Sequence, residues 1–105
     1  MGAGDLRKVM KEAQRLQAEI AESQQKLAAM EVAATAGGGV VRAVVSGDGD
    51  LVRIEISPEV ARPEEVDLLS DLVVAAVREA QAKAKEVAQQ TMAPLMRLLP
   101  PGFGP

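Results

Sequence analysis

The apolar and small residues near the start of the chain recur at alternating steps of three and four. These positions are Leu6, Val9, Ala13, Leu16, Ile20, Ser23, Leu27 and Met30. The spacing is a heptad seam, and no Gly or Pro interrupts it between Asp5 and Glu31. It predicts one amphipathic helix over 5–31, with Asp5 or Gly4 as its N-cap, that is able to pair with another helix. At 1.5 Å per residue this helix is about 39 Å long, so we expect part of it to project from a domain of this size.

After Met30 the pattern changes to a period of two and to β-branched residues. The residues that share one strand face are Val41, Ala43 and Val45 in one run and Val52, Ile54 and Ile56 in the next. Gly47 to Asp50 supplies a tight hairpin turn between the two runs. Residues 31–36 form a candidate first strand, joined through the three glycines at 37–39, which suit a turn or bulge. We therefore expect a three-stranded antiparallel sheet over 31–57.

A second helix is expected over 63–93. Ser57-Pro58 ends the sheet, because Pro cannot continue a strand ladder, and Pro63 suits a first helical position. The predicted apolar face consists of Val66, Leu69, Val73, Val77, Ala80, Ala84 and Val87. Pro94 should end or kink the helix, which leaves residues 94–105 as an extended tail. The chain is thus expected to be one α+β domain over 1–105, in the order helix, antiparallel strands, helix.

The composition favours a dimer. The chain has 105 residues, of which 48% are hydrophobic, but many of these are Ala and Val and the one aromatic residue is Phe103. Small side chains bury little area each, so a partner subunit would help to stabilise the domain. The absence of Cys favours an intracellular compartment, the N-terminus lacks a signal peptide, and the apolar runs are too short to span a membrane. We expect a cytoplasmic protein with no membrane segment.

Little in the sequence supports catalysis or cofactor binding. His and Cys are absent, and no serine has a visible activating base. The glycines at 37–39 are not followed by the Lys-Ser/Thr of a phosphate-binding loop, and Asp48 and Asp50 lack the later Glu of an EF-hand. We therefore expect no enzyme activity, no cofactor and no metal.

The first helix carries the best candidate for a DNA contact. Arg7, Lys8, Lys11 and Arg15 gather on one side of the helical wheel, opposite Leu6. The alternative is an ordinary solvated face, in which Glu12, Glu19 and Glu22 dilute the charge. The net charge of −3 argues against a nucleic-acid partner unless the charges are segregated along the chain.

A second basic group lies on the second helix. Arg78 and Lys85 are seven residues apart and share a face, so they could extend the same DNA-binding surface. The alternative is complementarity to the helix dipole, because this helix begins with acidic residues and ends with basic ones. On the strands, Arg42 and Arg53 are expected to pair with Glu55 or to be solvated, not to contact phosphate.

Three segments resemble proteins of the YbaB/EbfC family. Residues 10–17 (MKEAQRLQ) are similar to the opening helix of that family, 52–58 (VRIEISP) to its last strand and 69–76 (LSDLVVAA) to its second long helix. The terminal Leu99-Pro100-Pro101-Gly102-Phe103 matches as well, so the resemblance covers essentially the whole chain. It implies a tweezer-like homodimer in which the sheets form the central interface and the long helices project. It also implies a bacterial nucleoid-associated protein that binds double-stranded DNA, located in the nucleoid.

A second hypothesis is a protein-interaction module. In this reading the heptad face and the segment Leu98 to Phe103 recruit a replication or repair protein. The seam could pair within one chain, across a dimer or with a third protein, since a heptad pattern indicates helix pairing without naming the partner. Sequence preference for DNA differs within the family, so the resemblance leaves the preference of this chain open.

Overall fold

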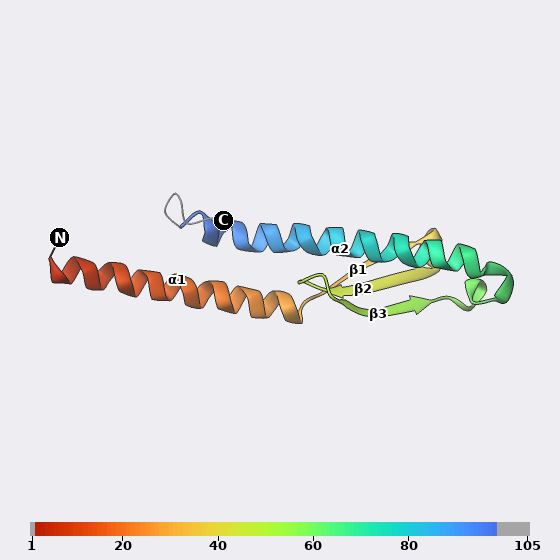
Figure 1. The fold of residues 1–105 in the computed structure, drawn as a ribbon, viewed down its shortest axis with the longest axis horizontal. Helices are drawn as coiled ribbons and strands as arrows, with labels where there is room; N and C mark the ends of the chain where they lie inside the picture. The colour runs from red at the N-terminus through yellow and green to blue at the C-terminus, as the bar shows by residue number, and fades with distance from the viewer. Residues whose placement is uncertain (1, 99–105) are drawn as a thin grey trace.

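The computed structural model describes residues 2–98 and contains two long helices with a small sheet between them in the chain (Figure 1). The elements are α1 (Ala3–Ala29), β1 (Glu31–Ala36), β2 (Val41–Ser46), β3 (Leu51–Ile56) and α2 (Val66–Met96). Short 3-10 turns occupy Gly37–Gly39, Pro58–Val60 and Pro63–Glu65. This order confirms the predicted α+β class with a three-stranded antiparallel sheet.

The three strands pair with their neighbours in the chain, in the order β1-β2-β3. Both pairs are antiparallel, and a register shift at Val44/Val45 bends the hairpin between β2 and β3. The positive φ of Gly37, Gly38 and Gly39 carries the connection from β1 to β2, as expected from three glycines in a row. Only β2 is paired on both sides, so β1 and β3 are the edges of the sheet.

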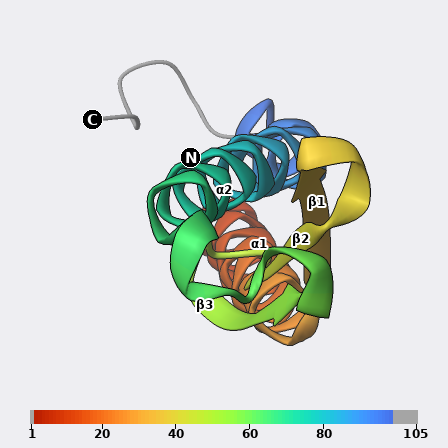
Figure 2. The same cartoon turned by 90° about the vertical axis from the view of Figure 1, so that its right-hand side faces the viewer.

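One face of the sheet packs against α2. Val41, Ala43 and Val45 of β2 are fully buried there, as the period of two predicts. The helix contributes Ala76, Ala80 and Ala84, which are also fully buried and lie on one side of α2. Alanine has no side chain beyond Cβ, so these positions allow the helix backbone to approach the sheet closely. Figure 2 shows α2 lying along the sheet in the view down the long axis.

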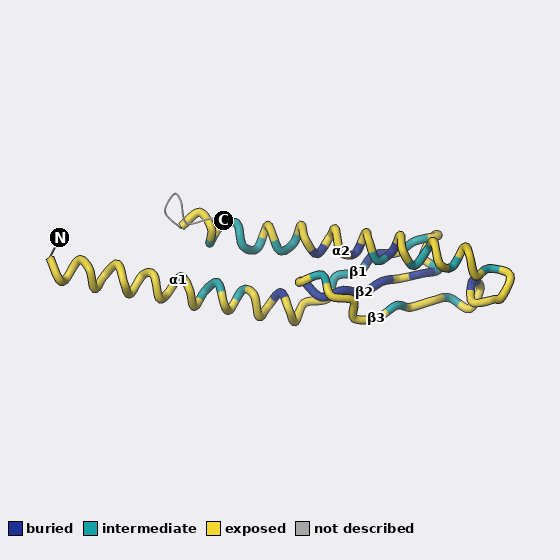
Figure 3. The backbone as a smooth tube through the Cα atoms, viewed as in Figure 1, coloured by how far each residue is buried: buried dark blue, intermediate teal, exposed yellow. Residues whose placement is uncertain are grey.

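The first helix extends away from the sheet. Figure 1 shows that its N-terminal part continues beyond the end of α2, and Figure 3 shows that this part is exposed all round. Residues 2–15 are all exposed, and Leu16 is the first half-buried residue of α1. The chain therefore measures 74 Å along its longest axis but only 22 and 17 Å across. This confirms that part of α1 projects.

Gly47 joins the root of α1 to the β2–β3 turn. Its backbone N–H donates to the carbonyl oxygens of Leu27 at 2.8 Å and Met30 at 3.1 Å. A Cβ at this position would lie 2.3 Å from the Leu27 oxygen, so only glycine fits here without displacement. The direction in which α1 leaves the sheet thus depends on a glycine that the sequence identified only as a turn residue.

The ends of both helices differ from the prediction. The first helix begins at Ala3 with Gly2 as its N-cap, and Asp5 lies inside the first turn, where its charge favours the helix dipole without capping. It ends at Ala29 because Met30 adopts an extended conformation at the C-cap, which frees Glu31 to begin β1.

The second helix begins at Val66, since Pro63 belongs to a separate 3-10 turn. Pro94 does not end it: the helix continues to Met96, so residues 94–96 are helical and not part of an extended tail. A proline this close to a helix end removes one backbone hydrogen bond and leaves the preceding turns intact. Residues 99–105 of the predicted tail lie outside the described residues.

Candidate nucleic-acid interface

The basic residues predicted on the first helix lie on its projecting part. We call Arg7, Lys8, Lys11 and Arg15 the α1 basic face. All four side chains are exposed, and they occupy the side of the helix opposite the seam that becomes buried further along at Leu27. A helix turns by about 100° per residue, so Lys8, Lys11 and Arg15 fall within about 60° of one another. The structure therefore brings these four cations onto one exposed surface.

The basic residues of α1 differ in whether a carboxylate lies close enough to form an ion pair. Arg15 lies 3.8 Å from Glu19, and Lys26 lies 3.4 Å from Glu22, each as a pair four residues apart on the surface. Arg7, Lys8 and Lys11 have no carboxylate within 4.0 Å in the part of the chain that the structure describes. The cations nearest the tip of α1 are thus the least compensated by neighbouring carboxylates.

Arg78 and Lys85 are exposed as well, but they lie elsewhere. Both project from the stretch of α2 whose other side packs on the sheet through Ala76, Ala80 and Ala84. The α1 basic face lies on the part of α1 beyond the sheet, so one chain does not bring the two basic groups together. A shared surface would require residues from two copies of the chain.

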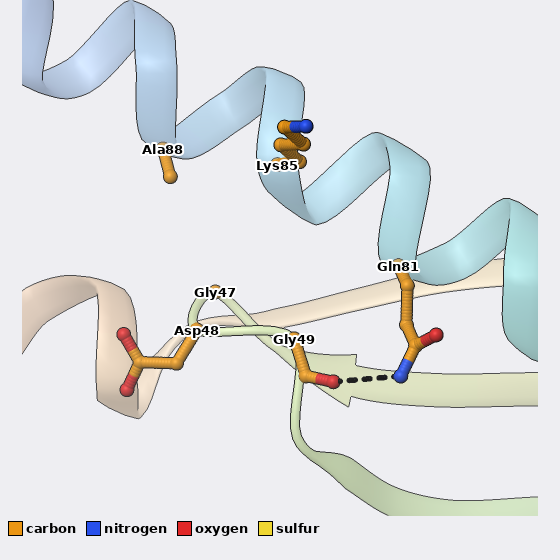
Figure 4. A pocket seen from close by; sticks show the side chains of 6 residues that line it. All are labelled: Gly47, Asp48, Gly49, Gln81, Lys85 and Ala88. Atoms are coloured by element: carbon orange, nitrogen blue, oxygen red, sulfur yellow. Dashed lines mark hydrogen bonds between the residues drawn. The ribbon is translucent and has the colours of Figure 1, made fainter.

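Lys85 borders a hollow at the root of α1. The hollow lies between the β2–β3 turn and α2, and the residues that line it are Gly47, Asp48, Gly49, Gln81, Lys85 and Ala88 (Figure 4). The Gln81 side chain donates a hydrogen bond of 3.1 Å to the backbone oxygen of Gly49, which holds the turn against α2. Figure 4 shows the Asp48 carboxylate directed toward the end of α1, away from Lys85. Sequence reasoning missed this hollow, because no local pattern links residue 48 to residue 85.

The arginines of the sheet are engaged in ion pairs. Arg42 and Arg53 both pair with Glu55, as predicted, the second at 3.5 Å. The pairing of Arg53 with Glu31 was not predicted. Arg42 pairs with Glu55 on the neighbouring strand, and Arg53 donates two hydrogen bonds, of 3.0 and 3.2 Å, to the carboxylate of Glu31. Hydrogen bonding and charge from Arg53 hold the pKa of Glu31 below its ordinary value. These arginines lie on the sheet face opposite α2 and are already compensated, so they are poor candidates for phosphate contacts.

Among the described residues, none of the helices is both long and apolar enough to cross a membrane. Within the same residues, no cluster of three His, Cys, Asp or Glu side chains is arranged to hold a metal ion. The segment Leu98 to Phe103, assigned above to a possible protein partner, lies outside the described residues from 99 onward.

The arrangement defines a class of protein: a small helix–sheet–helix domain that presents cations on a projecting helix. Comparison with known families is consistent with this class. Residues 1–99 match the model of the YbaB/EbfC DNA-binding family. The chain therefore belongs to the YbaB/EbfC DNA-binding family. Membership confirms the resemblance seen in the sequence and places the chain among DNA-binding proteins, not enzymes.

Individual relatives agree with this assignment. A nucleoid-associated protein of Saccharopolyspora erythraea is 45% identical over 103 residues, which cover 98% of this chain and 89% of the relative. A nucleoid-associated protein of Pelotomaculum thermopropionicum is 41% identical over 92 residues, which cover 88% of each chain. The crystal structure of uncharacterized protein HP0035 from Helicobacter pylori has a TM-score of 0.72 at 17% identity and covers 91% of this chain and 98% of the other. This likeness confirms the fold.

Proposed function

We propose that this chain is a nucleoid-associated protein that binds duplex DNA as a homodimer, through phosphate contacts made by the α1 basic face. The observation that carries the proposal is the position of Arg7, Lys8 and Lys11, which are exposed on a projecting helix and have no carboxylate of the described residues within 4.0 Å. Local potential, not net charge, decides where a polyanion binds, so a net charge of −3 does not oppose this site. The names of the relatives support a location in the nucleoid, within the cytoplasm.

Duplex DNA is favoured over single strands by the composition. Binding of single strands relies on aromatic side chains on which bases stack, and the whole chain contains one Phe and neither Trp nor Tyr. Lysine and arginine contacts to the backbone need no such platform. Phosphate contacts alone carry no sequence information, so we expect affinity to depend weakly on DNA sequence.

The dimer is supported by the shape of the chain. A compact protein of this length has a radius of gyration of about 13 Å, whereas this chain has 20.4 Å. It exposes 7585 Å² of surface, compared with about 5600 Å² for a typical folded monomer of 11.0 kDa. The excess exceeds the roughly 800 Å² that each partner contributes to a standard interface. The chain thus has enough extra surface for a stable dimer.

The apolar surface beside β3 is our candidate for the dimer interface. Val52 and Ile56 on β3 are 50 and 42% exposed, and the half-buried Ile54 between them belongs to the margin of the core. Among the strands of residues 2–98, none lies along the outer edge of β3. Isolated apolar residues on a surface are ordinary, but several beside a free strand edge indicate an interface. A second copy would cover both features.

The test is a salt titration of binding to a mixed-sequence duplex. Each phosphate contact adds about 0.9 to the slope of log affinity against log salt. The double variant Lys8→Glu/Lys11→Glu removes up to four contacts per dimer, so the slope should flatten by about 3–4. The matched control is Arg62→Glu/Lys83→Glu, which changes the net charge by the same amount away from α1.

The control should keep most of the slope. Equal loss in both variants would mean that net charge, not the α1 basic face, governs binding, and absence of binding at low salt would refute the proposal. Arg78→Glu/Lys85→Glu measures whether the second basic group contributes. Sedimentation of the DNA-free protein at high salt tests the dimer independently, with Ile56→Asp as the variant expected to dissociate it.

A further inference from the structure

The tip of α1 has an apolar side that none of residues 2–98 covers. Leu6 and Val9 are 53 and 55% exposed, although they continue the same seam that is half-buried at Leu16 and Ile20 and buried at Leu27, and the neighbouring Met10 is 56% exposed. The seam loses its cover because α1 extends beyond the end of α2 (Figure 1). The apolar side of this tip therefore lies in water unless another molecule covers it.

Charge is segregated between the two ends of the molecule. Residues 5–15 contain four cations and two carboxylates, whereas residues 59–71 contain five carboxylates and one arginine. The first group occupies the tip of α1, and the second surrounds the start of α2, at the opposite end of the 74 Å long axis (Figure 1). The two groups cannot meet within one chain, but they can meet between copies.

The acidic end also exposes apolar residues. Leu68 is 47% exposed, Asp71 lies three residues after it on the same side of α2, and Glu64 belongs to the 3-10 turn just before the helix. At the tip of α1, Arg7 lies three residues before Met10 on the same side of the helix, and Lys11 follows Met10 directly, about 100° further round the helix. Within the described residues, neither Glu64 nor Asp71 has a cation within 4.0 Å. Each apolar spot is therefore bordered by charges that complement those of the other.

We infer that, without DNA, the tip of α1 docks against the start of α2 of another copy, with Met10 against Leu68 and Arg7 and Lys11 against Glu64 and Asp71. DNA then competes with this acidic end for the same cations. The contact joins two different surfaces, so each proposed dimer presents both kinds of surface and can bind further dimers, in chains or in rings. It depends on exposed charges and therefore weakens as salt screens them. The docking stands on its own, whereas the competition rests on the proposed function.

The experiment measures self-association of the full chain by sedimentation velocity, at low and at high ionic strength and without DNA. At low salt we expect species larger than the dimer, which disappear at high salt. The variants Arg7→Glu/Lys11→Glu and Glu64→Lys/Asp71→Lys should each associate at least about tenfold more weakly, since each places like charges at the contact. Circular dichroism checks that both variants keep their helices.

Mixing the two variants provides the decisive control. Each variant repels copies of itself, but the acidic tip of one complements the basic end of the other, so the mixture should recover the large species. A mixture that stays small, or a wild-type protein that never exceeds the dimer at low salt, overturns the docking. Large species that persist in both variants overturn it too, because an apolar contact alone would then suffice.

Adding a short duplex tests the competition. DNA should dissociate the large species of the wild-type protein, and the Glu64→Lys/Asp71→Lys variant should still bind DNA. If the duplex binds without dissociating the large species, the competition is refuted while DNA binding stands. If no duplex binds at all, the proposed function fails, but the salt-dependent association remains as evidence for the docking.

Discussion

Replacing Gly47 by alanine is expected to separate the β2–β3 turn from the end of α1. The new Cβ would lie 2.3 Å from the carbonyl oxygen of Leu27 and 2.9 Å from its Cα, distances that a carbon atom does not tolerate. Both contacts are backbone atoms, so no side chain can rotate away. The turn must move outward, and the hydrogen bonds from Gly47 to Leu27 and Met30 are stretched or lost.

The magnitude follows from these contacts. The Gly47 N–H, shared between two carbonyl oxygens, contributes about 1 kcal/mol, and forcing extra atoms into a packed site costs about 1–3 kcal/mol. We expect a loss of about 3 kcal/mol in the free energy of unfolding, which lowers the urea midpoint by about 1–3 M. Urea titration followed by circular dichroism measures the change, at a fixed protein concentration because the proposed dimer makes stability concentration-dependent.

Two glycine variants serve as controls for Gly47→Ala. Gly4 lies in the first turn of α1 with no atom near its missing Cβ, so Gly4→Ala should be neutral or stabilising by up to about 1 kcal/mol. Gly49 has a φ of +88° and open space, so Gly49→Ala should cost about 1–2 kcal/mol from backbone strain alone. A Gly47→Ala protein within about 0.5 kcal/mol of the wild type would refute the steric reasoning.

Two further substitutions test the packing and the surface pairs. Ala80 is fully buried between α2 and the sheet, so Ala80→Leu should cost about 1–3 kcal/mol of unfolding free energy in a urea titration. Ala82→Leu, on the exposed side of the same helix, should stay within about 0.5 kcal/mol of wild type, and equal losses would argue against close packing at Ala80. Glu31→Gln removes the carboxylate partner of Arg53. The folded-state pKa of Glu31 lies below its ordinary 4.5, so its ion pair contributes stability above that pH and loses it as the pH falls through the lowered pKa. The Tm difference between wild type and Glu31→Gln should therefore be present at neutral pH and vanish in acid, and a difference that grows in acid would contradict the assignment.

Much of the fold could be predicted from the sequence because its signals are local. The change from heptad spacing to a period of two placed the end of α1 and the start of β1 within about two residues. The alternation in β2 also identified the buried row of Val41, Ala43 and Val45. The helix ends were less accurate: the seam did not reveal that Gly2 would cap α1, and Pro94 proved compatible with its last turn.

The candidate site was predicted in part. The helical wheel grouped the α1 basic face correctly, because residues three and four apart on a helix are always neighbours. The wheel could not show that this face lies beyond the sheet while Arg78 and Lys85 lie over it. It also ranked Val66 as a core position, although Val66 is among the most exposed apolar residues, and it omitted Ala76, which is fully buried. The side of α2 that meets the sheet depends on where α2 is anchored, and that is not a local property.

The sequence by itself determined the elements, their order and the side of each element that is apolar or basic. These properties depend on backbone geometry with fixed periods, which any segment of the right pattern adopts. The tertiary structure decided the direction in which α1 leaves the sheet, through the contact of Gly47 with Leu27. It also decided which apolar residues stay uncovered beside β3 and at the tip of α1, and that the opposite charges lie at opposite ends of the molecule. Such features depend on contacts between residues far apart in the chain, and the periodicity of a single helix or strand does not reveal these contacts.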